Sequence, residues 1–130
     1  MKTYHLFHVS VDPANPRQMA AWLQAGLGDL TGLETLGMHR PVAIVEAEDP
    51  EDLFRKTNSI VCSWTENEGV IESGEGLRST SVGDIIVDLA REEALVCASI
   101  GWDPLPAASA LEFLTIARAV EASRRAPAPE

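Results

Sequence analysis

The stretch 78-RSTSVGDIIVDLAREEALVCASI-100 decides the fold that we predict for this chain. It holds two apolar runs of strand length, residues 82–89 and 94–100, and the four residues between them are Ala-Arg-Glu-Glu. Two such runs joined by a short polar loop predict a β-hairpin. The hydroxyl-rich residues that lead into the first run predict a turn at the entry to the hairpin.

Upstream of the hairpin, residues 3–11 alternate in polarity, which predicts a strand with His5 and His8 on opposite faces. Residues 16–27 have apolar side chains at helical spacing, with Asn15 as the N-cap. Residues 28–38 are rich in glycine and predict a loop. The apolar run 41–47 predicts a second strand, and Asp49 and Pro50 mark the start of a second helix that ends near Thr57.

Residues 65–76 are polar and acidic and predict a connection, whereas a helix is expected from about residue 106 to Arg125. The predicted fold class is therefore α+β, with one small, mostly antiparallel sheet of about four strands covered by two or three helices. We expect these helices to cover one face of the sheet. The 130 residues suffice for one domain, expected over 1–125, and the tail 126–130 is expected to be disordered.

The charge of the chain restricts its partners. Twenty acidic and ten basic side chains give a formal charge of −10, which repels nucleic acids and anionic lipids. The first residues contain one lysine and no uninterrupted apolar run, so we expect no signal peptide, no membrane span and a cytoplasmic location. Direct binding to nucleic acid or to a membrane is not expected.

Neither a metal nor a cofactor is expected. His5 and His8 cannot chelate one ion from opposite faces of a strand, and no zinc or calcium motif is present. The glycines at 26 and 28 and at 74 and 76 lack the spacing of phosphate-binding loops. Cys62 and Cys97 are expected to be two buried thiols, as is usual in a reducing compartment.

Ser79, Thr80 and Ser81 form a hydroxyl cluster that admits a catalytic and a structural interpretation. A serine nucleophile needs a base and an orienting carboxylate, and His5, His8 and His39 are the available histidines. No nucleophile-elbow motif surrounds the cluster, which favours a structural turn. In that turn Gly83 permits a bulge or close packing, and Asp84 pairs with Arg78.

Acidic residues are concentrated between Glu46 and Glu75, where nine carboxylates face only Arg55 and Lys56, a local charge of −7. Such a run is either a solvated face or a surface that binds a basic partner. The tryptophans Trp22 and Trp64 are expected in the core, whereas Trp102 follows Gly101 at a strand end and is expected to be partly exposed as a binding anchor. The candidate partner-binding residues are Glu48, Asp49, Glu51, Asp52, Glu66, Glu68 and Trp102.

The segment from Val42 to Trp102 resembles the YodL-like domains of small proteins carried by phages, plasmids and integrative elements. The resemblance lies in Phe54-x-x-Thr57-Asn58, in Trp64-x-Glu66-Asn67, in the run from Arg78 to Asp84, and in the hairpin that closes on Gly101-Trp102. The chain departs from the pattern at residues 89–93, which lack the expected glycine turn, and in the helix after Leu105. The resemblance implies an accessory protein of a mobile element and assigns no catalytic residue. The motif residues, which we interpret as structural, are Arg78, Ser79, Thr80, Ser81, Gly83 and Asp84.

Three functions follow from these observations. The first is a non-enzymatic accessory protein that binds a protein partner. The second is an acidic nucleic-acid mimic that inhibits a host defence complex, of the anti-CRISPR or antirestriction type. The third is a small hydrolase that uses the hydroxyl cluster of Ser79 to Ser81. A homodimer is a further possibility, since the apolar face of residues 106–120 can pack on its own sheet or on a second copy.

Overall fold

The computed structural model describes residues 1–27, 37–58, 63–74 and 77–125. Residues 28–36 of the loop expected over 28–38, Cys62 and the tail 126–130 lie outside the described residues. The elements follow the order β1 (Lys2–Val9), α1 (Pro16–Gly26), β2 (His39–Ala47), α3 (Pro50–Thr57), η1 (Trp64–Glu66), β3 (Val70–Ser73), β4 (Ile85–Asp88), β5 (Glu93–Cys97), β6 (Trp102–Pro104) and α4 (Ala107–Arg125).

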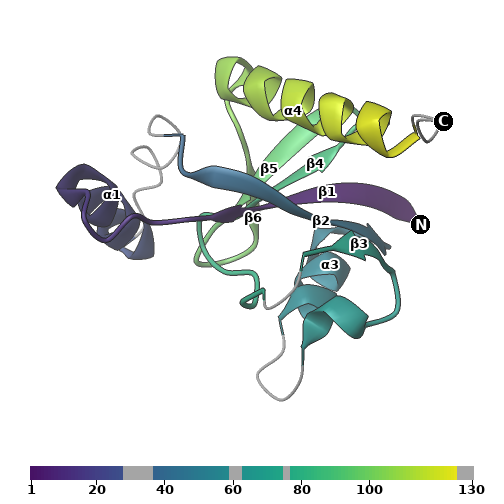
Figure 1. Ribbon diagram of the computed structural model, residues 1–130, viewed down its shortest axis with the longest axis horizontal. Helices are drawn as coiled ribbons and strands as arrows, with labels where there is room; N and C mark the ends of the chain where they lie inside the picture. The colour runs from purple at the N-terminus through teal and green to yellow at the C-terminus, as the bar shows by residue number, and fades with distance from the viewer. Residues whose placement is uncertain (28–36, 59–62, 75–76, 126–130) are drawn as a thin grey trace, which may run out of the picture.

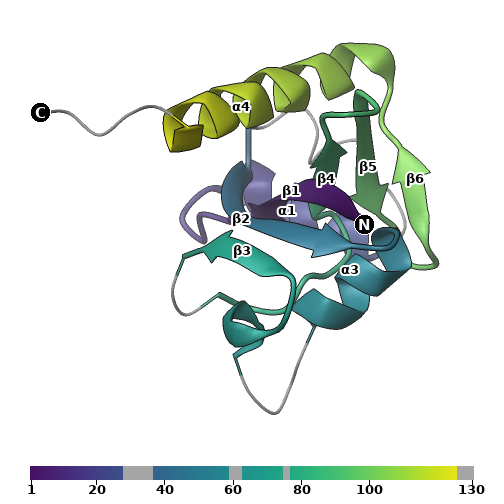
Figure 2. The ribbon, with the colours of Figure 1, turned by 90° about the vertical axis from the view of Figure 1, so that its right-hand side faces the viewer.

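The described strands form one antiparallel sheet in the order β3-β2-β1-β4-β5-β6, seen from one side to the other in Figure 2. The α+β class and the antiparallel sheet are as predicted, but the sheet has six strands instead of about four. The two additional strands are its short edges: β3 lies within the expected connection, and β6 begins at Trp102. Both edges are largely exposed, so they lack the buried, alternating pattern that reveals a strand in a sequence.

The predicted hairpin is present as β4 and β5, with its loop shifted by one residue. Asp88 pairs with Glu93, so the loop spans 89–92 instead of 90–93. Glu92 has a φ of 55°, in the left-handed region where glycine is usual. The chain thus makes the turn without the glycine that YodL-like domains lead us to expect.

The central strand β1 sends alternate side chains to the two faces of the sheet. His5 lies on the face covered by α4, where its Nε2 atom is 3.1 Å from Glu121 Oε2. His8 lies on the opposite face, where its ring centroid is 5.9 Å from that of Trp64. The predicted separation of the two histidines is therefore confirmed.

Helices cover both faces of the sheet, and the expectation of a single covered face is wrong. In Figure 1, α4 lies above the sheet and α3 below it. The α4 face holds a core of Phe7, Ile85, Val87, Ala94, Val96, Leu105, Phe113, Leu114 and Ala117. The α3 face holds Tyr4, Leu6, Ala43, Val45, Ala47, Leu53, Trp64 and Ile86. Burial on both faces explains the apolar runs of β2, β4 and β5, whereas β1 alternates in polarity and buries His5 and His8.

The two short helices begin as the sequence predicts. Asn15 Oδ1 accepts hydrogen bonds from the backbone N–H groups of Arg17 and Gln18, and Asp49 Oδ1 accepts one from Asp52. Each cap is followed by a proline at the first helical position. In α4, Phe113, Leu114 and Ala117 pack on the chain's own sheet, whereas Leu111, within the predicted apolar face of residues 106–120, is 60% exposed.

Candidate functional site

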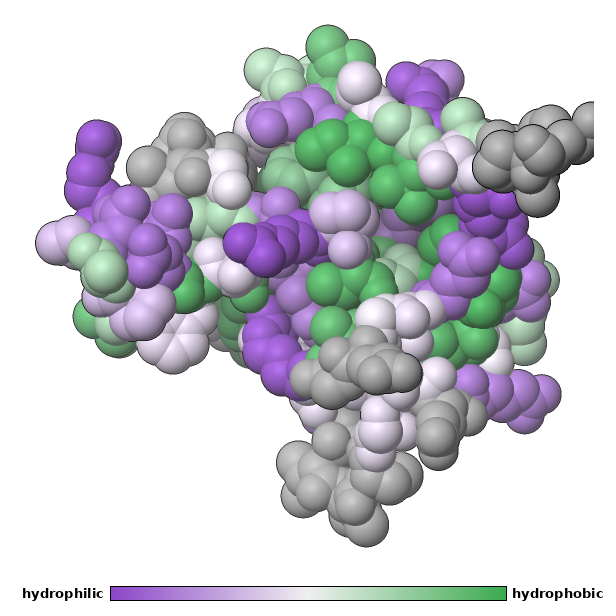
Figure 3. All heavy atoms as spheres, in the orientation of Figure 1, coloured by the Kyte–Doolittle hydropathy of each residue, from purple (hydrophilic) through white to green (hydrophobic). Residues whose placement is uncertain are grey.

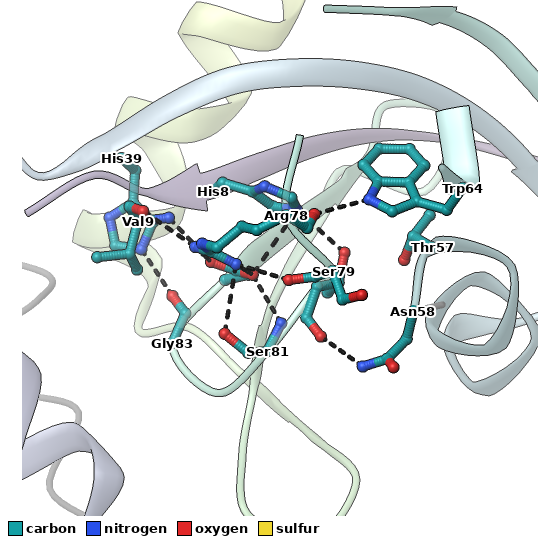
Figure 4. A network of polar contacts seen from close by, with 12 residues as sticks. His8, Val9, His39, Thr57, Asn58, Trp64, Arg78, Ser79, Ser81 and Gly83 are labelled. Carbon is teal, nitrogen blue, oxygen red and sulfur yellow. Dashed lines mark hydrogen bonds and ion pairs between the residues drawn. The ribbon is translucent and has the colours of Figure 1, made fainter. Parts of the chain in front are cut away.

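The motif from Arg78 to Asp84 forms a polar network around a buried carboxylate (Figure 4). The Asp84 side chain is fully buried and accepts four hydrogen bonds. Two come from the Arg78 guanidinium, at 2.7 Å each, and two from the backbone N–H groups of Val9 and Ser81, at 2.8 Å each. The predicted pairing of Arg78 with Asp84 is therefore confirmed, and its two-pronged geometry is the strong form of this ion pair.

Arg78 joins the motif to the end of the central strand. Its Nη2 atom donates to Val9 O at 2.9 Å, and its Nη1 atom donates to Ser79 O at 2.8 Å and to Ser81 Oγ at 3.3 Å. The hydrogen bonds to Asp84 raise the pKa of the guanidinium. The ion pair thus holds residues 78–84 against β1. We use the name Arg78–Asp84 network for six residues: Arg78, Asp84, Val9, Ser81, His8 and Thr80.

A second set of hydrogen bonds connects the same loop to α3 and η1. Trp64 Nε1 donates to Arg78 O at 2.7 Å, and Asn58 Nδ2 donates to Thr80 O at 2.9 Å. The backbone N–H of Thr80 donates to Thr57 O at 2.9 Å. Thr57, Asn58 and Trp64 belong to the sequence pattern of the family resemblance, and in the structure all three contact the loop of residues 78–84.

Gly83 closes the loop in a conformation that suits glycine. Its φ is 93°, its N–H donates to Cys97 O at 2.8 Å, and its carbonyl accepts from His39 Nε2 at 2.7 Å. A side chain at this φ would strain the backbone. Cys97 is a free, buried thiol, as predicted, and burial raises its pKa to about 12, so it is a poor nucleophile at neutral pH.

The geometry around the hydroxyl cluster is that of a structural turn. Thr80 is fully buried, and its Oγ1 lies 3.1 Å from His8 Nε2. His8 Nε2 is 3.7 Å from Asp84 Oδ2, and that carboxylate is already occupied by its four donors. Ser81 is exposed, but its Oγ accepts from Arg78. This arrangement orients the loop and leaves Asp84 without a free position for orienting a general base.

Within 1–27, 37–58, 63–74 and 77–125, no group of three or more His, Cys, Asp or Glu side chains is placed to hold a metal ion. No helix in these ranges is long and apolar enough to cross a membrane.

The titration of His8 predicts a loss of stability in acid. Burial lowers the pKa of His8 from 6.5 to about 4, so the unfolded chain takes up this proton at a higher pH than the folded chain. The free energy of unfolding should therefore fall as the pH drops from about 6.5 toward 4. One pKa unit corresponds to about 1.4 kcal/mol, so His8 alone should account for a loss of roughly 3 kcal/mol.

Urea unfolding measured by circular dichroism between about pH 7 and pH 4 tests this expectation. The variant His8→Gln lacks the titrating group and should show a shallower pH dependence than the wild type. Carboxylates protonate in both proteins, so the difference between the two slopes isolates the histidine. Equal slopes would contradict the assignment.

The acidic candidates divide into exposed and structural residues. Glu48, Asp49 and Glu51 are exposed around the start of α3. Asp52 is only 7% exposed and accepts from the Glu48 N–H at 2.9 Å. It also pairs with Arg55 and, at 3.3 Å, with Lys56. Asp52 is thus mainly an anchor for the helix, which its position in the sequence alone does not reveal.

Gly101, the residue before Trp102, lies next to Glu51, although about 50 residues separate them in sequence. A Cβ atom at the neighbouring Gly101 would lie 4.0 Å from Glu51 Oε1, which places the start of α3 beside the turn before β6. Trp102 is half-buried and packs against the core on the α3 face. We call Glu48, Asp49, Glu51 and Trp102 the α3 acidic surface. Glu68 is exposed just before β3, and Glu66 belongs to η1.

Two apolar surfaces were not predicted. Trp22, expected in the core, is 46% exposed on α1, together with Leu23 and Leu27, which are 58% and 89% exposed. A hollow of about 230 Å³ lies between α4 and β2 and is lined in part by Val42, Ile44 and Val120. Figure 3 shows hydrophobic side chains gathered along α4 and on the sheet below it. A helical pattern marks such apolar positions, but it cannot show which of them another element covers.

No family model, curated protein or solved structure matches the chain. The resemblance to YodL-like domains therefore stays a prediction that rests on the motif residues.

Proposed function

We propose that this chain is a non-enzymatic accessory protein of a mobile genetic element that acts in the cytoplasm by binding a basic protein partner through the α3 acidic surface. The observation that carries the proposal is the position of Glu51 beside Gly101, the residue that precedes Trp102. It joins exposed carboxylates to a half-buried tryptophan from a different part of the chain. Carboxylates that steer a basic partner and an aromatic anchor that gives binding energy are a usual combination in protein interfaces.

Carboxylates of several elements act on the Tyr4 side chain at the end of the sheet that lies near α3. Burial raises the pKa of the Tyr4 phenol, the charges of Asp88, Asp49 and Glu93 raise it further, and the charge of Arg91 lowers it. The phenol therefore lies in the field of carboxylates from both β4 and the start of α3. A field built from several elements attracts a basic surface more strongly than one exposed helix turn would.

The origin in a mobile element is supported by the Arg78 to Asp84 motif and its resemblance to YodL-like domains. These residues hold the loop in place, which agrees with a motif that stabilises the fold and takes no part in catalysis. Accessory proteins of this kind act on other proteins of the host or of a competitor, which is why we place the function in a protein contact.

A second candidate is the acidic nucleic-acid mimic, favoured by the local charge of −7 between Glu46 and Glu75. A mimic needs an extended array of free carboxylates. Asp52, one of the expected members, is buried and paired with Arg55 and Lys56. This pairing reduces the free charge at α3, so we prefer a basic protein surface as the partner.

The double variant Glu48→Lys/Glu51→Lys tests the proposed surface. Asp49 is left in place because it caps α3. We expect partner recovery to fall by roughly tenfold or more, since like charges would now face the basic partner. The measurement is quantitative mass spectrometry of proteins that co-purify with the tagged chain from its native host.

Glu92→Lys/Glu112→Lys is the matched control, because it makes the same change in net charge at exposed residues of the hairpin turn and α4. It should retain the partner. Loss of the same protein from both variants would contradict the proposal that the partner binds through the α3 acidic surface. Duplex DNA added as a competitor separates the two candidates: a partner displaced by DNA supports mimicry, and a retained partner supports a different basic surface. A catalytic turnover of this chain would overturn both.

A further inference from the structure

We infer that the exposed face of α1 is a self-association surface, through which two copies of this chain form a symmetric dimer. We call Trp22, Leu23 and Leu27 the α1 patch. Ala21 and Ala25, one turn apart, anchor the helix against Val9 and Met38. Leu23 lies on the opposite side of the helix, where the sheet does not reach, and Leu27, the C-cap residue of α1, follows four positions later.

The α1 patch is among the most exposed apolar surfaces of the described chain. Its three side chains are 46%, 58% and 89% exposed, in the order Trp22, Leu23 and Leu27. Figure 1 shows α1 at one end of the sheet, apart from α3 and α4. An aromatic and two leucines exposed together mark an interaction site more strongly than single apolar residues do.

The same patch contains both a projection and a hollow. Trp22 and Leu23 line a hollow of about 260 Å³, and its other wall is formed by Ser81 and Val82. Leu27, the C-cap residue of the same helix, follows Leu23 by four positions and projects with 89% of its surface exposed. In a dimer with twofold symmetry each copy presents one surface to itself, so a projection must meet a hollow on that same surface. The α1 patch offers both.

The charge distribution favours a second copy as the occupant. Each chain carries a net charge of −10, so two copies repel one another over most of their surface. Residues 13–28 are the longest stretch without Asp or Glu, and Arg17 is their only charged residue. The α1 patch is therefore where two acidic copies can approach with the least repulsion.

The placement of α1 also leaves the α3 acidic surface free. Lys2, at the start of β1, pairs with Ala47 at the end of β2, and α3 begins three residues after Ala47. The helix α1 follows the other end of β1, after Val9. A dimer formed through α1 would thus carry its two acidic surfaces at its far ends, although the dimer itself does not depend on the proposed function.

Sedimentation velocity and light scattering of the purified full chain over a range of concentrations test the inference. The wild type should approach twice the 14.0 kDa chain mass. Leu23→Glu/Leu27→Glu, which places two carboxylates in the patch, should stay at the mass of one chain. Ile100→Glu/Leu111→Glu is the matched control, because it adds the same charge at residues that are 93% and 60% exposed, and it should dimerise.

Salt gives a second measurement. Repulsion between the two acidic chains opposes an apolar contact, and salt screens this repulsion, so raising the salt concentration should strengthen the dimer. A dimer held by ion pairs between the copies would instead become weaker as the salt concentration rises. Circular dichroism confirms that each variant is folded. A wild type that stays at one chain mass at every concentration, or a patch variant that associates as well as the control, would overturn the inference. The inference would also be overturned if the α1 patch bound only a different protein and not a second copy of this chain.

Discussion

Replacement of Asp84 by alanine should lower the free energy of unfolding by about 3 kcal/mol, the lower end of the range for breaking a buried ion pair, because the remaining Arg78 side chain is 43% exposed. The carboxylate satisfies two N–H groups of the backbone, those of Val9 and Ser81, as well as the Arg78 guanidinium. Each buried donor left without an acceptor costs about 1 to 3 kcal/mol. Urea unfolding followed by circular dichroism near pH 7 measures the loss.

Asp88→Ala is the matched control for this variant. Asp88 is also buried, at 5% exposure, but its partners are weak: Arg91 N donates at 3.3 Å, and Arg91 Nε lies 3.9 Å away. Its removal should cost about 1 kcal/mol, as for an ordinary hydrogen bond. If Asp84→Ala were no more destabilising than Asp88→Ala, the Arg78–Asp84 network would not hold the loop as we describe.

The isosteric variant Asp84→Asn distinguishes structure from catalysis. The amide keeps the shape but replaces an acceptor oxygen by a donor and removes the negative charge, so the pairing with Arg78 is lost. We expect a loss of stability here as well. A hydrolase built on the hydroxyl cluster would in addition show a catalytic turnover that this variant abolishes.

The variant Trp64→Ala should cost about 3 to 5 kcal/mol, the usual range for truncating a buried aromatic side chain to alanine. Trp64 is 1% exposed and fills the core between α3 and the sheet. Its Nε1 atom also donates to Arg78 O, so the variant removes a link to the motif loop as well as a large side chain. Chemical unfolding of the full chain provides the measurement.

Two further variants separate the parts of this effect. Trp64→Phe keeps most of the apolar volume and lacks the indole N–H, so it reports mainly the hydrogen bond to Arg78 O and the smaller ring. Trp22→Ala makes the same truncation at a tryptophan that is 46% exposed and should cost much less. Similar losses for Trp64→Ala and Trp22→Ala would contradict the burial of Trp64.

The Arg78–Asp84 network also connects the two proposed surfaces to the fold. Ser81 gives its N–H to Asp84, and with its neighbour Val82 it forms one wall of the hollow beside α1. Asn58, at the end of α3, is tied to Thr80 O in the same loop. The motif therefore has a structural role with a consequence for binding, because it positions the wall of the α1 hollow and the end of α3.

Local patterns were sufficient for most elements. The caps at Asn15 and Asp49, the hairpin of β4 and β5 and the start of α4 near residue 106 could be predicted, because each depends on neighbouring residues. The edge strands β3 and β6 could not. They have three or four residues and exist only because a longer strand offers them hydrogen bonds.

The candidate sites were predicted only in part. The pairing of Arg78 with Asp84 follows from their spacing in a short loop. Nothing in the sequence shows that the backbone N–H of Val9 donates a hydrogen bond to the same carboxylate. The burial of Asp52 was missed because it depends on Arg55 and Lys56 in the folded helix. The exposure of Trp22 was missed because an apolar helix face is covered only where another element packs on it.

The sequence by itself determined the α+β class, the hairpin, the helix starts and the acidic character of the chain, since propensity, capping and charge act over a few residues. Only the tertiary structure decided which of these features meet. It surrounded Asp84 with donors from β1 and its own loop, placed Glu51 beside Gly101, the residue before Trp102, and left the α1 patch uncovered. These outcomes depend on contacts between distant segments, and such contacts are set by how all the elements pack together.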